Sequence, residues 1–189
     1  MPRRRTIKGT NQTTTRSRND GLAFEHTLDL SNQMYLRKGI AVITKRAAPV
    51  KVIRKVGNVV KEGYFEKAST VDYDGVYKNK SIQFDAKSIL SLDRFDLSMV
   101  KKHQYEHMLR CQQHGAICFL LIEFISQRKI YLLTIDTLKS YVEASKAGGR
   151  KSIRIEDLDI HAYEVDKYLT KRVPVDYLKA VDQVFDLID

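Results

Sequence analysis

Two aspartates and a lysine, spaced as Asp72, Asp85 and Lys87, are the residues of this chain whose types and spacing best fit a chemical reaction. Carboxylates that converge from neighbouring strands can hold Mg²⁺, a hard cation that prefers oxygen ligands and keeps several of its waters. Such a metal polarises a phosphodiester and lowers the pKa of a bound water. A lysine two residues after the second acid can orient that water or stabilise charge that develops on the phosphate. The pattern therefore indicates metal-assisted hydrolysis of a phosphodiester.

The stretch that must position these residues, 70–88, predicts a β-hairpin. Its strands are expected at 75–77 and 81–87, and its turn at 78–80. Since side chains alternate between the two faces of a strand, the apolar residues of the second strand should form a core face. Asp85 and Lys87 should point the other way, where Asp72 joins them from the preceding strand. The alternative is a solvated face with an ordinary Asp–Lys pair, because this spacing often occurs by chance.

The net charge of +10 is concentrated in two segments. Segment 1–20 has six basic side chains against one acid and segment 37–61 has eight and no acid, so they contribute +5 and +8 and the remainder −3. Such localised charge is typical of a surface that binds a polyanion. Nucleic acid is therefore the expected ligand, and an acidic membrane surface is the weaker alternative. The residues expected to contact DNA are Arg3, Arg4, Arg5, Lys45, Arg46, Lys51, Arg54, Lys55, Lys61, Arg150 and Lys151.

The chain of 189 residues is long enough for one domain with a proper core. Residues 1–19 lack apolar periodicity and are expected to form a flexible basic arm. A single domain should follow over 20–189, and it should begin with an amphipathic helix from about Asp20 that Gly39 terminates. This helix carries Glu25, whose position alone indicates a surface glutamate.

The rest of the domain alternates strands and helices. A buried strand is expected at 40–43, a helix at 97–113 with Ser98 as its N-cap, a central strand at 116–124, a strand at 129–133, a helix ending near Ala144 and a last helix near 174–187. Gln104 should point from its helix toward the sheet. Residues 148–152 predict a flexible basic loop whose backbone could approach a phosphate. This order of elements predicts an α/β fold, with a mixed sheet flanked by helices.

Residues 50–64 predict a second hairpin, because two β-branched runs flank the turn signal Gly57-Asn58. The hairpin mixes Val and Ile with Lys and Arg and offers too little apolar surface to be wholly buried. A basic ribbon that projects from the body would fit a DNA groove or a branch point. The alternative is an ordinary edge hairpin whose lysines suppress edge-to-edge aggregation.

The two cysteines, Cys111 and Cys118, have neither metal nor disulfide spacing and are expected to be reduced thiols. The longest apolar run, 116–122, is too short to span a bilayer. The basic, polar N-terminus does not have the pattern of a signal peptide. These features predict a cytoplasmic protein that does not enter a membrane.

Taken together, these features resemble the RecU-type Holliday junction resolvases, a family of PD-(D/E)xK nucleases found in low-GC Gram-positive bacteria and some of their phages. The resemblance runs from about residue 19 to the C-terminal helix. The matching stretches are 21–25 (GLAFE), 39–43 (GIAVI), 61–65 (KEGYF), 69–75 (STVDYDG), 84–87 (FDAK), 103–108 (HQYEHM), 115–119 (GAICF) and 149–153 (GRKSI). Eight matches in the same order are far more specific than the acid–acid–lysine spacing, and they favour the nuclease interpretation.

The resemblance implies roles for particular residues. They are Asp72, Asp85, Lys87 and Gln104 in catalysis, and Asp72, Asp85, Glu25 and the carbonyl of Ala86 as ligands of Mg²⁺ or its substitute Mn²⁺. It also implies a homodimer, whose two sites would make paired nicks, and a stalk at 50–64 that reaches into an open four-way junction. A recombinase or a branch-migration helicase is the expected protein partner.

The sequence departs from the family pattern in two places. Position 85 usually carries Glu, whereas Asp85 is one methylene shorter, and the hairpin at 50–64 is several residues shorter than expected. Two alternatives to a structure-selective endonuclease therefore stay open. A non-catalytic protein that binds branched DNA or modulates a recombinase would need only the basic segments. An ordinary duplex endonuclease of the same fold would show no preference for four-way junctions.

Overall fold

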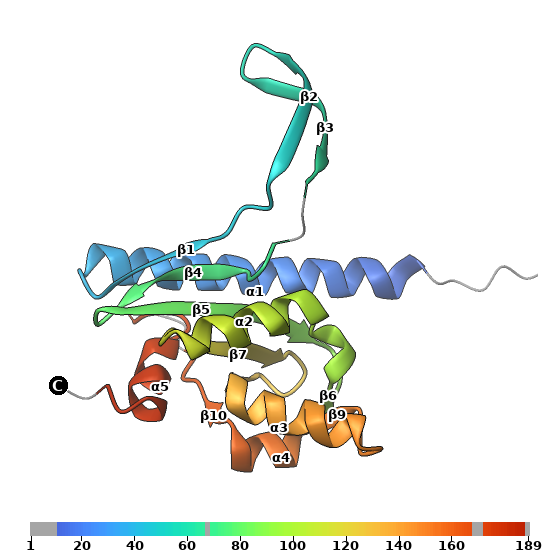
Figure 1. Cartoon of the computed structure of the whole chain (residues 1–189), viewed down its shortest axis with the longest axis vertical. Helices are drawn as coiled ribbons and strands as arrows, with labels where there is room; N and C mark the ends of the chain where they lie inside the picture. Colours follow the sequence, from blue (N-terminus) through green and yellow to red (C-terminus); the bar gives the residue numbers. More distant parts are fainter. Residues whose placement is uncertain (1–10, 67–68, 168–171, 188–189) are drawn as a thin grey trace, which may run out of the picture.

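A computed structural model describes residues 11–66, 69–167 and 172–187 (Figure 1). Its centre is a six-stranded sheet of order β1-β4-β5-β7-β8-β10, in which β5 and β7 run parallel and the other neighbouring strands run antiparallel. The strands are β1 (Ala41–Lys45), β4 (Tyr73–Tyr77), β5 (Lys80–Ile89), β7 (Ile117–Phe124), β8 (Lys129–Thr134) and β10 (Tyr163–Glu164). The sheet is mixed, as predicted.

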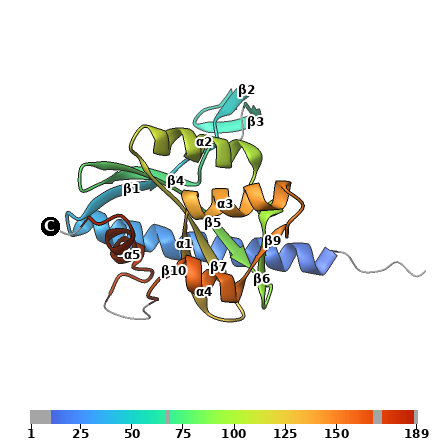
Figure 2. The ribbon, with the colours of Figure 1, turned by 60° about the horizontal axis from the view of Figure 1, so that its bottom comes forward.

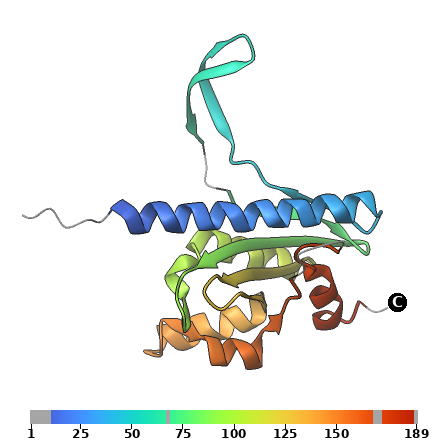
Figure 3. The same cartoon turned by 180° about the vertical axis from the view of Figure 1, so that it is seen from behind.

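Helices cover both faces of this sheet (Figures 2 and 3). One face carries α1 (Asn11–Arg37) and α5 (Tyr177–Val184), and the other carries α2 (Lys102–Gln113), α3 (Ile135–Lys146) and α4 (Ile155–His161). Each face has its own buried apolar cluster, so the fold is an α/β sandwich around two cores. The predicted fold class is confirmed. In the described part of the chain, no helix combines the length and the apolar character needed to cross a bilayer.

The first helix is longer than its apolar pattern predicted. It begins at Asn11, so the predicted start at Asp20 is wrong by nine residues. Once a helix is nucleated, each further residue adds one backbone hydrogen bond, and poor helix formers can therefore prolong it. Residues 1–10 lie outside the described residues, and with them Arg3, Arg4 and Arg5 of the predicted arm. The other end agrees with the prediction, since Gly39, at a φ of 67°, terminates the helix.

The strands that position the two aspartates rest on a row of aromatic rings. The rings of Tyr73, Phe84 and Phe119 stack in that order across β4, β5 and β7, with centroids 4.8 and 4.9 Å apart. All three side chains are fully buried, and burial of each contributes about 1.5–3 kcal/mol. They lie on the face that α1 covers. The opposite face of the same strand segment carries Asp85.

Parallel strands need a crossover connection, and α2 supplies it between β5 and β7. The helix starts at Lys102, so the prediction of Ser98 as its N-cap is wrong. Residues 97–99 instead form a short 3₁₀ turn, because the side chain of Asp96 accepts a hydrogen bond from the Ser98 N–H at 2.8 Å. β7 is buried along its whole length, as predicted for a central strand.

Two small sheets lie outside the main one. The first is the predicted hairpin, β2 (Val50–Val56) and β3 (Val59–Phe65), which projects from the body and has every residue exposed (Figures 1 and 3). The second pairs β6 (Arg94–Asp96) with β9 (Ser152–Arg154). The loop predicted at 148–152 therefore leads into a strand, and its predicted flexibility is wrong from Lys151 onward, where the carbonyl accepts a hydrogen bond from Leu97 N–H at 3.0 Å.

Candidate active site

Asp85 is the buried centre of the candidate site, with no exposed surface. Its Oδ1 accepts hydrogen bonds from the backbone N–H of Asp72 and from Nε2 of Gln104, each at 3.0 Å. Its Oδ2 lies 2.7 Å from Nζ of Lys87. The solvated Asp–Lys pair that the spacing alone left open is therefore wrong. A carboxylate of this kind stays ionised in a protein only beside cations or strong donors.

Asp72 reaches this position because the pairing of β4 with β5 ends one residue after it. The last register pair on that side is Tyr73 with Phe84. Beyond this pair, a side chain replaces the backbone as acceptor: Oδ2 of Asp72 accepts a hydrogen bond from Ala86 N–H at 3.1 Å. The side chains of Asp72 and Lys87 keep 22% and 15% of their surface exposed, so solvent reaches the site from their side.

Gln104 comes to Asp85 because the crossover helix α2 must pass over the parallel pair that it connects. The residue is 7% exposed, and its Oε1 is buried without a hydrogen-bond partner among the described residues. An unpaired buried acceptor costs roughly 1–3 kcal/mol, so it indicates a missing donor. A hydrated cation beside the two carboxylates would bring such donors, because its bound waters donate hydrogen bonds. The donor set thus fits a hard divalent metal.

The ligands that could hold this metal are the carboxylates of Asp72 and Asp85 and the carbonyl of Ala86. In the structure the Lys87 ammonium lies 2.7 Å from Asp85 and 3.8 Å from Asp72, so it is the cation that faces both carboxylates. The side chain of Glu25 pairs with Lys45 in the structure. Within the described ranges, no three His, Cys, Asp or Glu side chains gather as a metal site would require. The role of Glu25 as a ligand stays a prediction.

Burial raises the pKa of Asp85 to about 6; the Lys87 ammonium opposes this rise, and the charge of Asp72 adds to it. The folded protein therefore binds this proton more tightly than the unfolded chain, whose aspartates have a pKa near the ordinary value of 3.8. Ionisation of Asp85 consequently favours unfolding. The free energy of unfolding therefore falls as the pH rises from the ordinary pKa of 3.8 to the raised pKa of about 6.

We expect the metal-free protein to lose stability relative to its Asp85→Asn variant as the pH rises from about 4 to about 6. The relative loss should be on the order of 2–3 kcal/mol, since one pKa unit corresponds to about 1.4 kcal/mol. Urea unfolding in EDTA at several pH values across this window measures the two free energies of unfolding. Two curves that run parallel over the whole window would show that burial of the charge has no such effect.

A second polar pair extends the site along β4. Asp74 lies on the same face as Asp72, and its Oδ2 is 3.6 Å from a guanidinium nitrogen of Arg46. Arg46 also donates to the hydroxyl of Thr70 at 2.6 Å, and its backbone N–H to the carbonyl of Asp72 at 2.8 Å. The sequence interpretation placed Arg46 on DNA but overlooked Asp74, which strand alternation from Asp72 could have found.

His107 was also overlooked. It lies one helical turn after Gln104, and its Nε2 is 2.8 Å from Oε1 of Gln83, the residue two positions before Asp85. Burial lowers the pKa of His107, and the charges of Arg46 and Arg110 act in the same direction. His107 is therefore a neutral imidazole, and it lies next to Gln104 on the side of α2 that faces β5.

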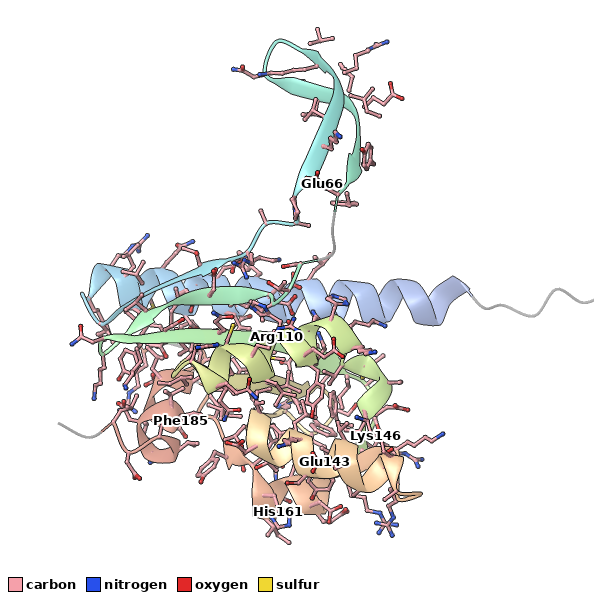
Figure 4. The ribbon with its side chains drawn as sticks, in the orientation of Figure 1. Glu66, Arg110, Glu143, Lys146, His161 and Phe185 are labelled. Carbon is pink, nitrogen blue, oxygen red and sulfur yellow. The ribbon has the colours of Figure 1, made fainter. Side chains whose placement is uncertain are left out.

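The predicted DNA-binding residues fall at separate places. Lys51, Arg54, Lys55 and Lys61 are all exposed on the hairpin, whose side chains point outward beyond its base at Glu66 (Figure 4). Arg46 borders the candidate site, and Lys45 is engaged by Glu25. Arg150 and Lys151 directly precede β9, which lies away from the hairpin (Figure 1). The structure therefore separates one predicted surface into several.

The chain is similar to known proteins along most of its length. The family model described as recombination protein U, RecU, matches residues 19–183. The chain is 38% identical over 171 residues to the Holliday junction resolvase RecU of Pediococcus pentosaceus, covering 88% of this chain and 84% of the relative. It is 36% identical over 172 residues to that of a Geobacillus species, covering 88% and 85%. For Lactiplantibacillus plantarum the identity is 36% over 171 residues, covering 88% and 82%.

Proposed function

The chain belongs to the RecU family of Holliday junction resolvases, and on this basis we propose that it is a metal-dependent endonuclease that resolves four-way DNA junctions by paired nicks. The observation that carries the proposal is the buried Asp85, which lies against Asp72, Lys87 and Gln104 within the residues that the family model matches. A buried carboxylate whose pKa is raised by burial and which has a specific charged partner is typical of a functional site.

Asp72, Asp85 and the Ala86 carbonyl would hold Mg²⁺, or Mn²⁺ in its place, which supplies Lewis-acid polarisation of the phosphate and a more acidic water. Gln104 holds Oδ1 of Asp85 with its nitrogen and offers its free oxygen to a donating water. Lys87, released from Asp85, orients the attacking water and stabilises charge on the phosphate. Attack on phosphorus forms the new P–O bond and breaks the P–O3′ bond, which leaves 5′-phosphate and 3′-hydroxyl ends.

Paired nicks require two active sites on opposing strands. A homodimer with two-fold symmetry would supply them, since each protomer carries one site and a four-way junction has a matching pseudo-two-fold axis. The basic hairpin would enter the junction and select branched over linear DNA.

The experiment that tests the function compares a synthetic four-way junction with a linear duplex of the same sequence in Mg²⁺. Paired, symmetric nicks in the junction, suppressed by Asp72→Asn, are expected. Equal cutting of the two substrates would identify an ordinary duplex endonuclease. Tight junction binding without cutting in Mg²⁺ or Mn²⁺ would identify a non-catalytic junction-binding protein, and either result would overturn the proposal.

We expect Lys87→Met to raise the affinity of the free protein for Mn²⁺ by about tenfold or more. The Lys87 ammonium lies 2.7 Å from Asp85, so a divalent ion must displace it or share the site with a like charge. Two unit charges about 4 Å apart interact by about 4 kcal/mol at an effective dielectric constant of 20, well above the roughly 1.4 kcal/mol of a tenfold change. Titration calorimetry at pH 8, where Asp85 is ionised, gives the affinity.

The matched control is Lys139→Met, which removes a partly exposed ammonium from α3. It should leave Mn²⁺ binding unchanged. If Lys87→Met binds Mn²⁺ as weakly as the parent protein, the ammonium does not compete with the metal, and the proposed release of Lys87 is wrong.

A further inference from the structure

The ribbon β6–β9 presents two arginines directly opposite each other. Arg94 pairs with Arg154, and next to them Phe95 pairs with Ile153. Because Phe95 and Ile153 are fully buried, strand alternation holds the two arginines on the outer face. Like charges in direct opposition destabilise a pair of strands. The arginine pair is therefore a feature that the fold itself does not need.

The end of α3 directs two more basic residues to the same place. Gly148 has a φ of 93°, and a Cβ on Gly149 would lie 2.7 Å from a carbonyl oxygen of α3, which is closer than side chains allow. The chain thus turns sharply there and enters β9, with the Lys151 carbonyl bonded to the backbone of Leu97. Arg150 and Lys151 are consequently held beside the ribbon by backbone geometry.

The four basic residues line one hollow of about 420 Å³, together with Asp93, Ser152 and Glu156. Of the four, Arg94 has an ion pair, with Asp93 at 3.5 Å, and both side chains are more than 60% exposed. A surface pair of this kind contributes little. In the part of the chain that the structure describes, no ion pair involves Arg150, Lys151 or Arg154. Three cations at one hollow thus lack an ion-pair partner, and the four basic and two acidic residues of its lining leave a net charge of +2.

Guanidinium groups present a planar fork of donors that matches the oxygens of a phosphate. We propose that Arg94, Arg150, Lys151 and Arg154 form a phosphate cradle, which binds a backbone phosphate of the DNA arm that leaves the cut site. The assignment rests on the proposed function, because it requires DNA at Asp85. It adds Arg94 and Arg154 to the contact surface, and it gives the basic segment around residue 150 a defined ligand.

The cradle is within reach of a strand whose cut phosphate lies at the active site. Arg94 follows Lys87 by seven positions, which span about 25 Å at most in an extended chain. Since each DNA strand presents one phosphate per about 3.4 Å of helix axis, a phosphate up to about seven nucleotides from the cut can meet the cradle. The hairpin projects from the other side of the body (Figures 1 and 3). Contacts on both sides of the cut would fix the direction of the arm.

The test uses a series of junctions, each with a single methylphosphonate at a different position of the arm, so that the charge of one phosphate is removed at a time. Affinity is measured for the full chain in EDTA, so that no DNA is cut. The parent protein should lose roughly five- to tenfold at one or two adjacent positions within about seven nucleotides of the cut, and less than twofold elsewhere in that arm. The variant Arg94→Gln/Arg154→Gln should bind the unmodified junction more weakly and should no longer respond at those positions. Its log–log salt slope should be flatter by about one to two units.

The matched control, Arg128→Gln/Lys139→Gln, removes the same charge from exposed positions that do not line the hollow. It should keep the parent profile. A uniform loss at every position in the Arg94/Arg154 variant would show general attraction and would overturn the cradle. Unchanged DNA binding would leave an acidic protein surface as the ligand and would also overturn it. The methylphosphonate series measures binding alone. An absence of junction cutting would therefore refute the proposed function, but it would leave the test of the cradle unaffected.

Discussion

Replacing Asp85 by Asn should lower the rate of junction nicking by a factor on the order of 10³ or more while the protein stays folded and bound to DNA. The metal contributes several kcal/mol of charge stabilisation, and each 1.4 kcal/mol corresponds to a factor of ten in rate. Asn removes one of two carboxylates that would hold it. The Asn oxygen can still accept from Asp72 N–H and from Gln104, the two bonds that Oδ1 of Asp85 accepts now. The fold should therefore survive the change.

Single-turnover nicking in Mg²⁺ measures the rate, and junction binding in EDTA measures whether the DNA surface is intact. Asp186→Asn is the matched control, because its exposed carboxylate lies just after α5 and has no place in the site or in the cradle. Asp85→Glu keeps the charge but adds a methylene at a fully buried position, which costs about 1–3 kcal/mol of stability. A loss below about tenfold in Asp85→Asn would mean that this carboxylate does not hold the metal.

Replacing Lys51, Arg54, Lys55 and Lys61 by Gln should weaken junction binding by about 10³-fold and linear duplex binding far less. Each phosphate contact contributes about 0.9 to the log–log salt slope, so four lost contacts amount to about 10³-fold at about 0.15 M salt. The preference arises because the projecting hairpin meets phosphates that converge only at the branch point. Since every hairpin residue is exposed, folding and the chemistry at Asp85 should be unaffected.

The measurement is the ratio of junction to duplex affinity at fixed salt, with the melting temperature as the control for folding. A variant that removes the same charge from exposed positions of the body carries Gln at Lys80, Lys102, Arg128 and Lys139. It should lower both affinities in proportion. If the hairpin variant keeps the parent ratio, the hairpin is a protected sheet edge, and junction selectivity must come from the spacing of two active sites in a dimer.

The local parts of the site could be read from the sequence. The hairpin that carries Asp72 and Asp85, the common face of Asp85 and Lys87, and the turn at Gly57-Asn58 follow from strand alternation and turn chemistry. These rules involve residues that are near one another in the chain. For the same reason the buried run of β7 identified the centre of the sheet.

Overlooked residues had weaker local signals. Asp74 and His107 follow site residues at the spacing of a strand and of a helical turn, but neither stands out before its neighbour is known. Arg94 and Arg154 are 60 positions apart in the sequence, and their juxtaposition depends on the register of two three-residue strands. Strands this short carry no periodic pattern from which a pairing could be predicted.

The sequence by itself determined which side chains share a face, and the tertiary structure decided what covers that face. Nothing in the spacing of Asp85 and Lys87 distinguishes a solvated pair from a buried one. The pairing of β5 with β7 places the crossover helix α2 over them, seals Asp85 from water and brings Gln104 to its carboxylate. Local preferences act over a few residues, whereas strand pairing and burial depend on contacts between distant segments, and it is burial that raises the pKa of Asp85.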